Sequence, residues 1–283
     1  MDGRRGLVLG GGGITGIAWE TGLVAGLLDA GVDLREADRV LGTSAGSVVG
    51  AQLRSSTPVE ELFATQAAEH VPRPGEKAAT VGPRVLLGYV ASLARARGDG
   101  VAMARQLGRF AVRRAEAGRT PTLEARLTAI RGRLPSLEWP ELHLAVTAVD
   151  AATGALRVLD ADSGVPLLDA VAASCAVPGV YPPVPIEGRP HVDGGALSGT
   201  HADLMVGECA RVLVLAPIDR GVGPMRPAGQ LLGDVPHVVL APDEASRAAI
   251  GRNVLDPAAR AASARAGRDQ AVRVLDRVRD LWG

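Results

Sequence analysis

The pentapeptide Gly42-Thr43-Ser44-Ala45-Gly46 has the spacing of a serine nucleophile, Gly-x-Ser-x-Gly. In this pattern the serine lies on a tight turn between a strand and a helix, and the glycines leave room for the turn to close. A strand pattern at 38–41 and an apolar stretch at 48–53 flank the motif as required. Backbone amides at the start of the helix would stabilise developing negative charge. We therefore predict that Ser44 is a catalytic nucleophile whose turn is supported by the two glycines.

A glycine-rich loop at residues 10–16 follows the first short strand pattern, residues 6–9. Consecutive glycines let backbone N–H groups converge on one point, which suits an oxyanion hole or a phosphate cradle. The loop also has the spacing of a dinucleotide-binding loop, at Gly11, Gly13 and Gly16. Such a site needs an acidic residue at the end of the second strand. That strand runs into the serine motif instead, so the sequence favours an oxyanion hole.

The third candidate motif is Asp193-Gly194-Gly195, which follows a proline-rich stretch. Two glycines after an aspartate let it approach another loop closely, although the same tripeptide is common in simple surface turns. His201 and His237 come after it, in the Ser, acid, His order of α/β-hydrolases. The nucleophile of that fold follows several strands, however, whereas Ser44 follows only the second. We therefore expect structural or surface roles for the histidines.

The elements that must position these motifs alternate along the chain. The first 55 residues read as strand, loop, helix, strand, turn and helix, an order typical of a parallel sheet with covering helices. Gly31 predicts the end of the first helix, and a long helix that packs on the sheet is predicted from Pro257 onward. Further strand patterns occur at 142–149, 156–159, 212–215 and 238–240, and a helix end with an extended loop is expected at 173–184.

Residues 55–135 differ from this pattern, since they are rich in alanine and arginine and carry few strand signals. Between Arg84 and Arg133 the chain has eleven arginines against three acidic residues. We expect this segment to form several helices, inserted like a cap into a single domain that spans residues 1–283. The arginines favour solvated helical faces, with contact to an anionic lipid surface as the alternative. Within the segment, residues 85–90 fit a core helix better than an apolar lip over the site.

Composition excludes several classes of function. Lysine plus arginine and aspartate plus glutamate both number 31, so the net charge is zero, which argues against nucleic acid as the main partner. No apolar run approaches the roughly 18 residues of a membrane span. Cys175 and Cys209 have neither metal-ligand spacing nor a disulfide framework. A cytoplasmic location without a bound metal is therefore expected.

The motifs together resemble the patatin-like phospholipase family. Four blocks occur in the family's order and approximate spacing, namely the glycine loop, the serine motif, the segment 173–184 and Asp193-Gly194-Gly195. The resemblance spans residues 6–215 and implies an α/β fold of three layers, α/β/α, with a mostly parallel sheet. Two departures are Thr15, where the family usually has arginine or lysine, and residues 198–201, which lack the family's Asn-x-Pro. The missing basic residue weakens the case for a phosphate-bearing substrate.

The resemblance implies a hydrolase of lipid or small acyl esters that uses a Ser–Asp dyad without histidine, forms an acyl-enzyme and needs no cofactor. Peripheral membrane contact fits such a substrate. The alternatives are an acyltransferase that uses the same site and an inactive lipid-binding scaffold. The expected site residues are Ser44 as nucleophile, Asp193 as general base, the amides of Gly11, Gly12 and Gly13 as the oxyanion hole, and Gly42, Gly46, Gly194 and Gly195 as supporting glycines.

Overall fold

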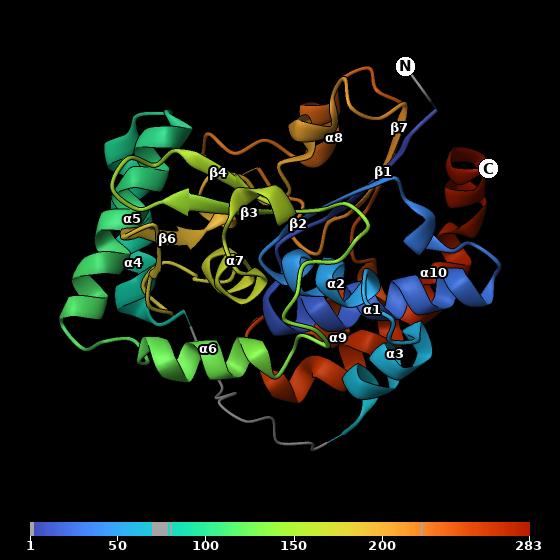
Figure 1. Cartoon of the computed structure of the whole chain (residues 1–283), viewed down its shortest axis with the longest axis horizontal. Coiled ribbons are helices and arrows are strands. Elements are labelled where there is room, and N and C mark those ends of the chain that lie inside the picture. The colour runs from blue at the N-terminus through green and yellow to red at the C-terminus, as the bar shows by residue number, and fades with distance from the viewer. Residues whose placement is uncertain (1–2, 70–78, 80, 222) are drawn as a thin grey trace.

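One sheet organises the computed structural model, which describes residues 3–69, 79, 81–221 and 223–283 (Figure 1). Within these residues eight strands are joined in the order β5-β6-β3-β2-β1-β7-β8, and β4 also pairs with β3. Neighbours among β3, β2, β1, β7 and β8 are parallel, whereas β4, β6 and β5 pair antiparallel. The predicted α/β class with a mostly parallel sheet is therefore confirmed. The strands are β1 (Arg5–Leu9), β2 (Arg39–Thr43), β3 (Leu144–Asp150), β4 (Leu156–Leu159), β5 (Val184–Ile186), β6 (Arg189–Asp193), β7 (Arg211–Leu215) and β8 (His237–Leu240).

Helices cover both faces of this sheet, which confirms the three layers. Successive residues of a strand point to opposite faces, so Leu7 and Leu9 pack toward α1 and α2, whereas Val8 packs toward α8 and the short turn at 202–205. In Figure 1, α1, α2 and α7 lie below the sheet and α8 lies above it. The helices are α1 (Gly13–Asp29), α2 (Ala45–Leu53), α3 (Val59–Ala67), α4 (Pro83–Ala96), α5 (Gly100–Glu116), α6 (Leu123–Arg131), α7 (Leu167–Ser174), α8 (Ala228–Leu232), α9 (Glu244–Ile250) and α10 (Arg260–Trp282).

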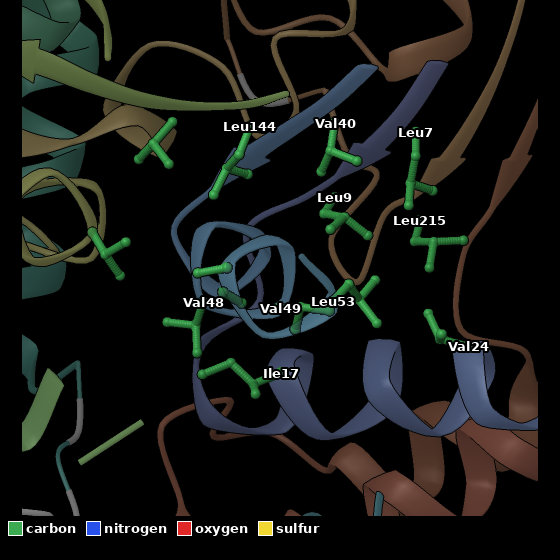
Figure 2. Packing of buried hydrophobic residues seen from close by; sticks show 14 of the residues in the cluster. Leu7, Leu9, Ile17, Val24, Val40, Val48, Val49, Leu53, Leu144 and Leu215 are labelled. Atoms are coloured by element: carbon green, nitrogen blue, oxygen red, sulfur yellow. The ribbon is translucent and has the colours of Figure 1, made fainter. Parts of the chain in front are cut away.

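The largest part of the core lies between the sheet and helices α1 and α2 (Figure 2). Each fully buried leucine or valine contributes roughly 1.5–3 kcal/mol relative to an exposed one. This packing fixes the ends of β1 and β2, from which the glycine loop and the serine motif start. The side chains labelled in Figure 2 are Leu7, Leu9, Ile17, Val24, Val40, Val48, Val49, Leu53, Leu144 and Leu215.

The C-terminal helix α10 packs mainly along α1 and reaches β7 and β8 with part of its length. The prediction that it packs on the sheet is therefore only partly right, because α1 already covers much of that face. Glycines make the contact close. A Cβ at Gly26 would lie 2.6 Å from the Arg268 carbonyl oxygen, and one at Gly267 would overlap the backbone of α1. Among the helices of the described residues, none combines the length and the apolar character that a membrane span needs.

Helices α3 to α6 occupy the described part of residues 55–135, as predicted, while residues 70–78 and 80 of that segment lie outside the described residues. Helix α4 packs on α5, and α5 contacts β3 and β6. The prediction of a core helix at 85–90 is wrong for one face, because Leu86 and Leu87 are exposed. The hairpin of β5 and β6 was not predicted, since such short strands show little periodicity. The organisation as one domain with a cap-like insertion stays a prediction.

Candidate active site

Ser44 lies on a sharp turn between β2 and α2. The strand ends one residue before it, the helix begins one residue after it, and the Ser44 backbone has φ 54° and ψ −114°. Such a conformation costs a non-glycine residue on the order of 1–3 kcal/mol, and strain of this kind concentrates at active sites. The glycines of the motif make the turn possible, because a Cβ at Gly42 would lie 2.5 Å from the Gly46 oxygen and one at Gly46 would overlap Leu9. The structure thus places Ser44 at the N-terminus of α2.

Neighbouring side chains hold the Ser44 backbone in this conformation. The Ser44 amide donates to Ser174 Oγ at 2.8 Å. The Ser44 carbonyl accepts from Ser47 Oγ at 2.7 Å and from Cys175 Sγ at 3.2 Å. Burial raises the pKa of the Cys175 thiol, which keeps it protonated as a donor. These roles of Ser174 and Cys175 were not predicted, although both residues belong to the segment 173–184 that the sequence singles out.

Asp193 is the last residue of β6 and lies opposite Ala148 of β3. Its carboxylate accepts a hydrogen bond from the Gly195 amide at 2.7 Å, and the Ser44 side chain lies near enough to lower the pKa of the carboxyl group. Glycine is required at the intervening position, because a Cβ at Gly194 would overlap the hydroxyl of a β3 threonine. The structure therefore brings the predicted nucleophile and the predicted base, which are far apart in the sequence, close together.

Burial raises the pKa of Asp193 to about 6, from an ordinary value of 3.8. The Ser44 side chain, the hydrogen bond from the Gly195 amide and the positive charge of Arg126 oppose this rise without cancelling it. A carboxylate with a pKa near 6 accepts a proton more readily than one near 4 and is still mostly ionised at neutral pH. The buried environment therefore gives Asp193 a basicity that an exposed aspartate lacks.

The glycine loop connects β1 to α1 beside the nucleophile. A Cβ at Gly11 would stand 3.6 Å from the Ser44 Cβ, but the Gly11 amide donates to the Gly199 carbonyl at 2.9 Å. The amides of Gly12 and Gly13 have no acceptor among the described residues, because they precede the first hydrogen bonds within α1. Gly13 also has φ 63°, a conformation that favours glycine. Of the three predicted oxyanion donors, Gly11 is thus engaged, whereas the Gly12 and Gly13 amides lack an acceptor among the described residues and Gly13 lines the pocket at Ser44.

The histidines that could complete a triad bind backbone carbonyls instead. His201 Nε2 lies 3.0 Å from the Gly194 carbonyl oxygen. His237 Nδ1 lies 2.6 Å from the Val235 carbonyl oxygen. Within the described residues, no imidazole contacts the serine–aspartate pair, and no three histidine, cysteine or acidic side chains gather as potential metal ligands. The pair therefore stands without a histidine in the part of the chain that the structure describes.

A small pocket of about 20 Å³ lies at Ser44. It is far smaller than the roughly 300–1,000 Å³ of typical ligand pockets, so the side chains around it must move before it can take an acyl chain. Arg126 of α6 and Arg133 just after α6 both line it, and neither was singled out from the sequence. Helix α4 adds Tyr89, whose pKa is raised by burial and further by the nearby charge of Asp193. The helical segment thus contributes side chains around the serine.

The comparison with known protein families covers most of the chain. A family model described as patatin-like phospholipase matches residues 7–206, a range that includes all three site loops. A search of curated proteins finds no match. Among solved structures, the crystal structure of VipD from Legionella pneumophila is similar over 97% of this chain and 67% of the VipD chain, with 15% sequence identity and a TM-score of 0.48.

Proposed function

The chain belongs to the patatin-like phospholipase family, and on this basis we propose that it hydrolyses acyl esters of lipids through a serine–aspartate dyad. Membership makes it a hydrolase of a family that acts on lipids. The observation that carries the finer proposal is the position of the Ser44 side chain near the buried Asp193 carboxylate, whose pKa is raised by burial to about 6. A strained serine beside a basic, buried carboxylate is suited to nucleophilic attack.

In the proposed first step, Ser44 Oγ attacks the ester carbonyl carbon while its proton moves to the Asp193 carboxylate. The carbonyl oxygen becomes an oxyanion that accepts from the amides of Gly12 and Gly13, whereas Gly11, bound to Gly199, shapes the loop. The bond to the alcohol then breaks, the alcohol leaves with the proton from Asp193, and the acyl group stays on Ser44. In the second step Asp193 takes a proton from water, the water oxygen attacks the acyl carbon, and Ser44 recovers its proton as the acid leaves.

A fluorophosphonate probe is expected to inactivate the enzyme by labelling Ser44, because the serine attacks phosphorus as it would attack an ester carbonyl. Intact-protein mass spectrometry should show one adduct, and peptide mapping should place it on the peptide that contains Ser44. Ser55, two residues after the end of the same helix, is the internal control and should stay unmodified. Ester turnover by a protein that labels elsewhere, or not at all, would contradict the assignment.

The two alternatives make different predictions for the same experiments. An acyltransferase forms the same acyl-enzyme but passes the acyl group to an alcohol, so added glycerol should yield acylglycerol at the expense of free acid. An inactive scaffold would leave Ser44 unlabelled in folded protein. The raised pKa of Asp193 beside the serine favours a reactive site over an inactive one.

We also propose peripheral contact with a membrane surface through α4. Leu86, Leu87 and Val90 on this helix are 57%, 67% and 55% exposed, and Arg95 is exposed as well. Apolar side chains combined with arginine suit the boundary between an anionic head-group layer and the acyl chains. The same helix carries Tyr89 near Asp193, so contact through α4 would bring lipid close to the serine.

Replacing Leu87 with aspartate is expected to weaken binding to phosphatidylglycerol vesicles about tenfold, because burial of a leucine is worth roughly 1.5–3 kcal/mol. Co-sedimentation with the vesicles measures this, and phosphatidylcholine vesicles show how much of the binding depends on anionic lipid. Val272 of α10 is 74% exposed on another helix, so Val272→Asp is the matched control and should bind as the wild type does. Equal binding by Leu87→Asp and the wild type would exclude α4 as the contact.

A further inference from the structure

Arg126 is a buried cation with few compensating contacts. Only 4% of the residue is exposed, and its Nε is buried without a hydrogen-bond partner among the described residues. One terminal nitrogen, Nη2, donates to the Cys175 carbonyl at 2.8 Å, and the guanidinium lies 3.7 Å from the centre of the Tyr181 ring. The ion pairs of the described residues do not include Arg126. A buried charge without a direct ion pair is unfavourable, so the site favours an anion that arrives from outside.

The surroundings of Arg126 make the pocket electropositive at the nucleophile. Arg126 and Arg133 line the same pocket as Ser44, and no aspartate or glutamate lines it. Burial and, after it, the charge of Arg133 both lower the pKa of Arg126. The Asp193 carboxylate acts in the opposite direction on this pKa, and that carboxylate already accepts a hydrogen bond from the Gly195 amide.

The positive charge at the pocket comes from α6 and not from the glycine loop. Thr15 stands where related loops usually carry arginine or lysine, and here it is fully buried. Its amide and its hydroxyl both donate to the Val254 carbonyl, at 3.1 and 3.3 Å. The loop therefore offers no cation to a substrate, whereas Arg126 reaches the pocket from the helical segment.

We propose that Arg126, together with Arg133, binds an anionic group of the substrate beside Ser44, so that the enzyme prefers acyl esters bearing a phosphate or a carboxylate. A guanidinium presents N–H donors in a planar fork that matches both groups, and the unpartnered Nε of Arg126 is such a donor. Stacking on Tyr181 and the bond to Cys175 hold the fork in place. The inference rests on the proposed hydrolase function and names the class of substrate.

The test compares two esters that differ only by a phosphate group, lysophosphatidate with a hexanoyl chain and monohexanoylglycerol. Release of hexanoate by the full-length protein at about pH 8, where Asp193 is ionised, gives kcat and KM for each. The wild type should have the lower KM for lysophosphatidate. Arg126→Met keeps the apolar stem and removes the charge, and it should raise KM for lysophosphatidate about tenfold or more while changing the neutral ester less than about threefold. Arg131→Met, an exposed arginine on the same helix, is the control and should change neither.

The outcomes separate recognition of an anion from a role in positioning. Equal losses on both esters in Arg126→Met would mean that the arginine only positions Asp193 or the loop, and would overturn the proposal. Inorganic phosphate should inhibit hydrolysis of the neutral ester competitively. Inhibition by phosphate without a preference for lysophosphatidate would assign the site to a free anion and would also overturn the substrate role.

Two further results keep the proposal testable if Arg126→Met does not fold. Arg133→Gln should shift the preference in the same direction, and the wild-type preference and phosphate inhibition need no variant at all. Absence of both wild-type effects overturns the inference. Turnover of monohexanoylglycerol with fluorophosphonate labelling of Ser44 would in that case leave the hydrolase function standing, whereas no turnover of either ester would contradict the hydrolase function itself.

Discussion

Ser44→Ala is expected to lower hydrolysis of monohexanoylglycerol by roughly 10³-fold or more, because removal of a nucleophilic serine abolishes the covalent route. The remaining groups could still bind the ester and polarise its carbonyl through the amides of Gly12 and Gly13. They could not form an acyl-enzyme. The measurement is the rate of hexanoate release at saturating ester, together with loss of the fluorophosphonate adduct.

Loss of activity must be separated from loss of structure. Ser55→Ala removes a hydroxyl just after the end of α2, where it donates to the Gln52 carbonyl at 2.7 Å, and should retain near-wild-type activity. Ser44→Gly should be as inactive as Ser44→Ala but more stable by about 1 kcal/mol, because glycine relieves the strain at φ 54°. Substantial turnover by either Ser44 variant would rule out this serine as the nucleophile.

The features that the sequence predicts are those whose signals are local. The turn at Ser44 needs a glycine two residues before it and another two residues after it. A side chain at Gly42 would collide within the turn, and one at Gly46 would collide with β1. Gly31 likewise ends the first helix with φ 83°. In each case the glycines that the turn requires stand close together in the sequence or at the end of the helix, so a short pattern is enough to predict the turn.

The contacts that the sequence does not predict join distant segments. Nothing near Arg126 distinguishes it from the other arginines of its segment, and its burial depends on Tyr181 and Cys175, which lie far along the chain. The same holds for Gly11, whose amide is occupied by the carbonyl of Gly199. The link between Asp193 and Ser44 was expected only from the resemblance to a family, because it depends on β6 pairing antiparallel with β3.

Asp193→Asn is expected to reduce kcat/KM by about 10²–10⁴-fold, the usual contribution of a general base. Asparagine can still accept from the Gly195 amide, but it cannot take the Ser44 proton. In the wild type kcat/KM should rise with pH around a midpoint of about 6, the pKa of Asp193, and this rise should be absent from the residual activity of the variant. The rise of kcat/KM with pH should persist in His201→Ala and in His237→Ala. Loss of this rise in His237→Ala would instead support a triad with histidine.

The same substitution should make the protein more stable at neutral pH. Asp193 has a pKa of about 6 in the folded protein against 3.8 ordinarily, so folding favours its protonated form. This preference stabilises the wild type fully below about pH 4. The stabilisation is lost as the pH rises through 6, and the free energy of unfolding then falls by about 3 kcal/mol in total. The asparagine side chain does not titrate, so the free energy of unfolding of Asp193→Asn should exceed that of the wild type by a margin that grows from about pH 4 to about pH 7.5. Denaturant unfolding at the two pH values measures the margin. If the difference in unfolding free energy were the same at both pH values, Asp193 would not be desolvated. The raised pKa that makes it a suitable base would then have no physical cause.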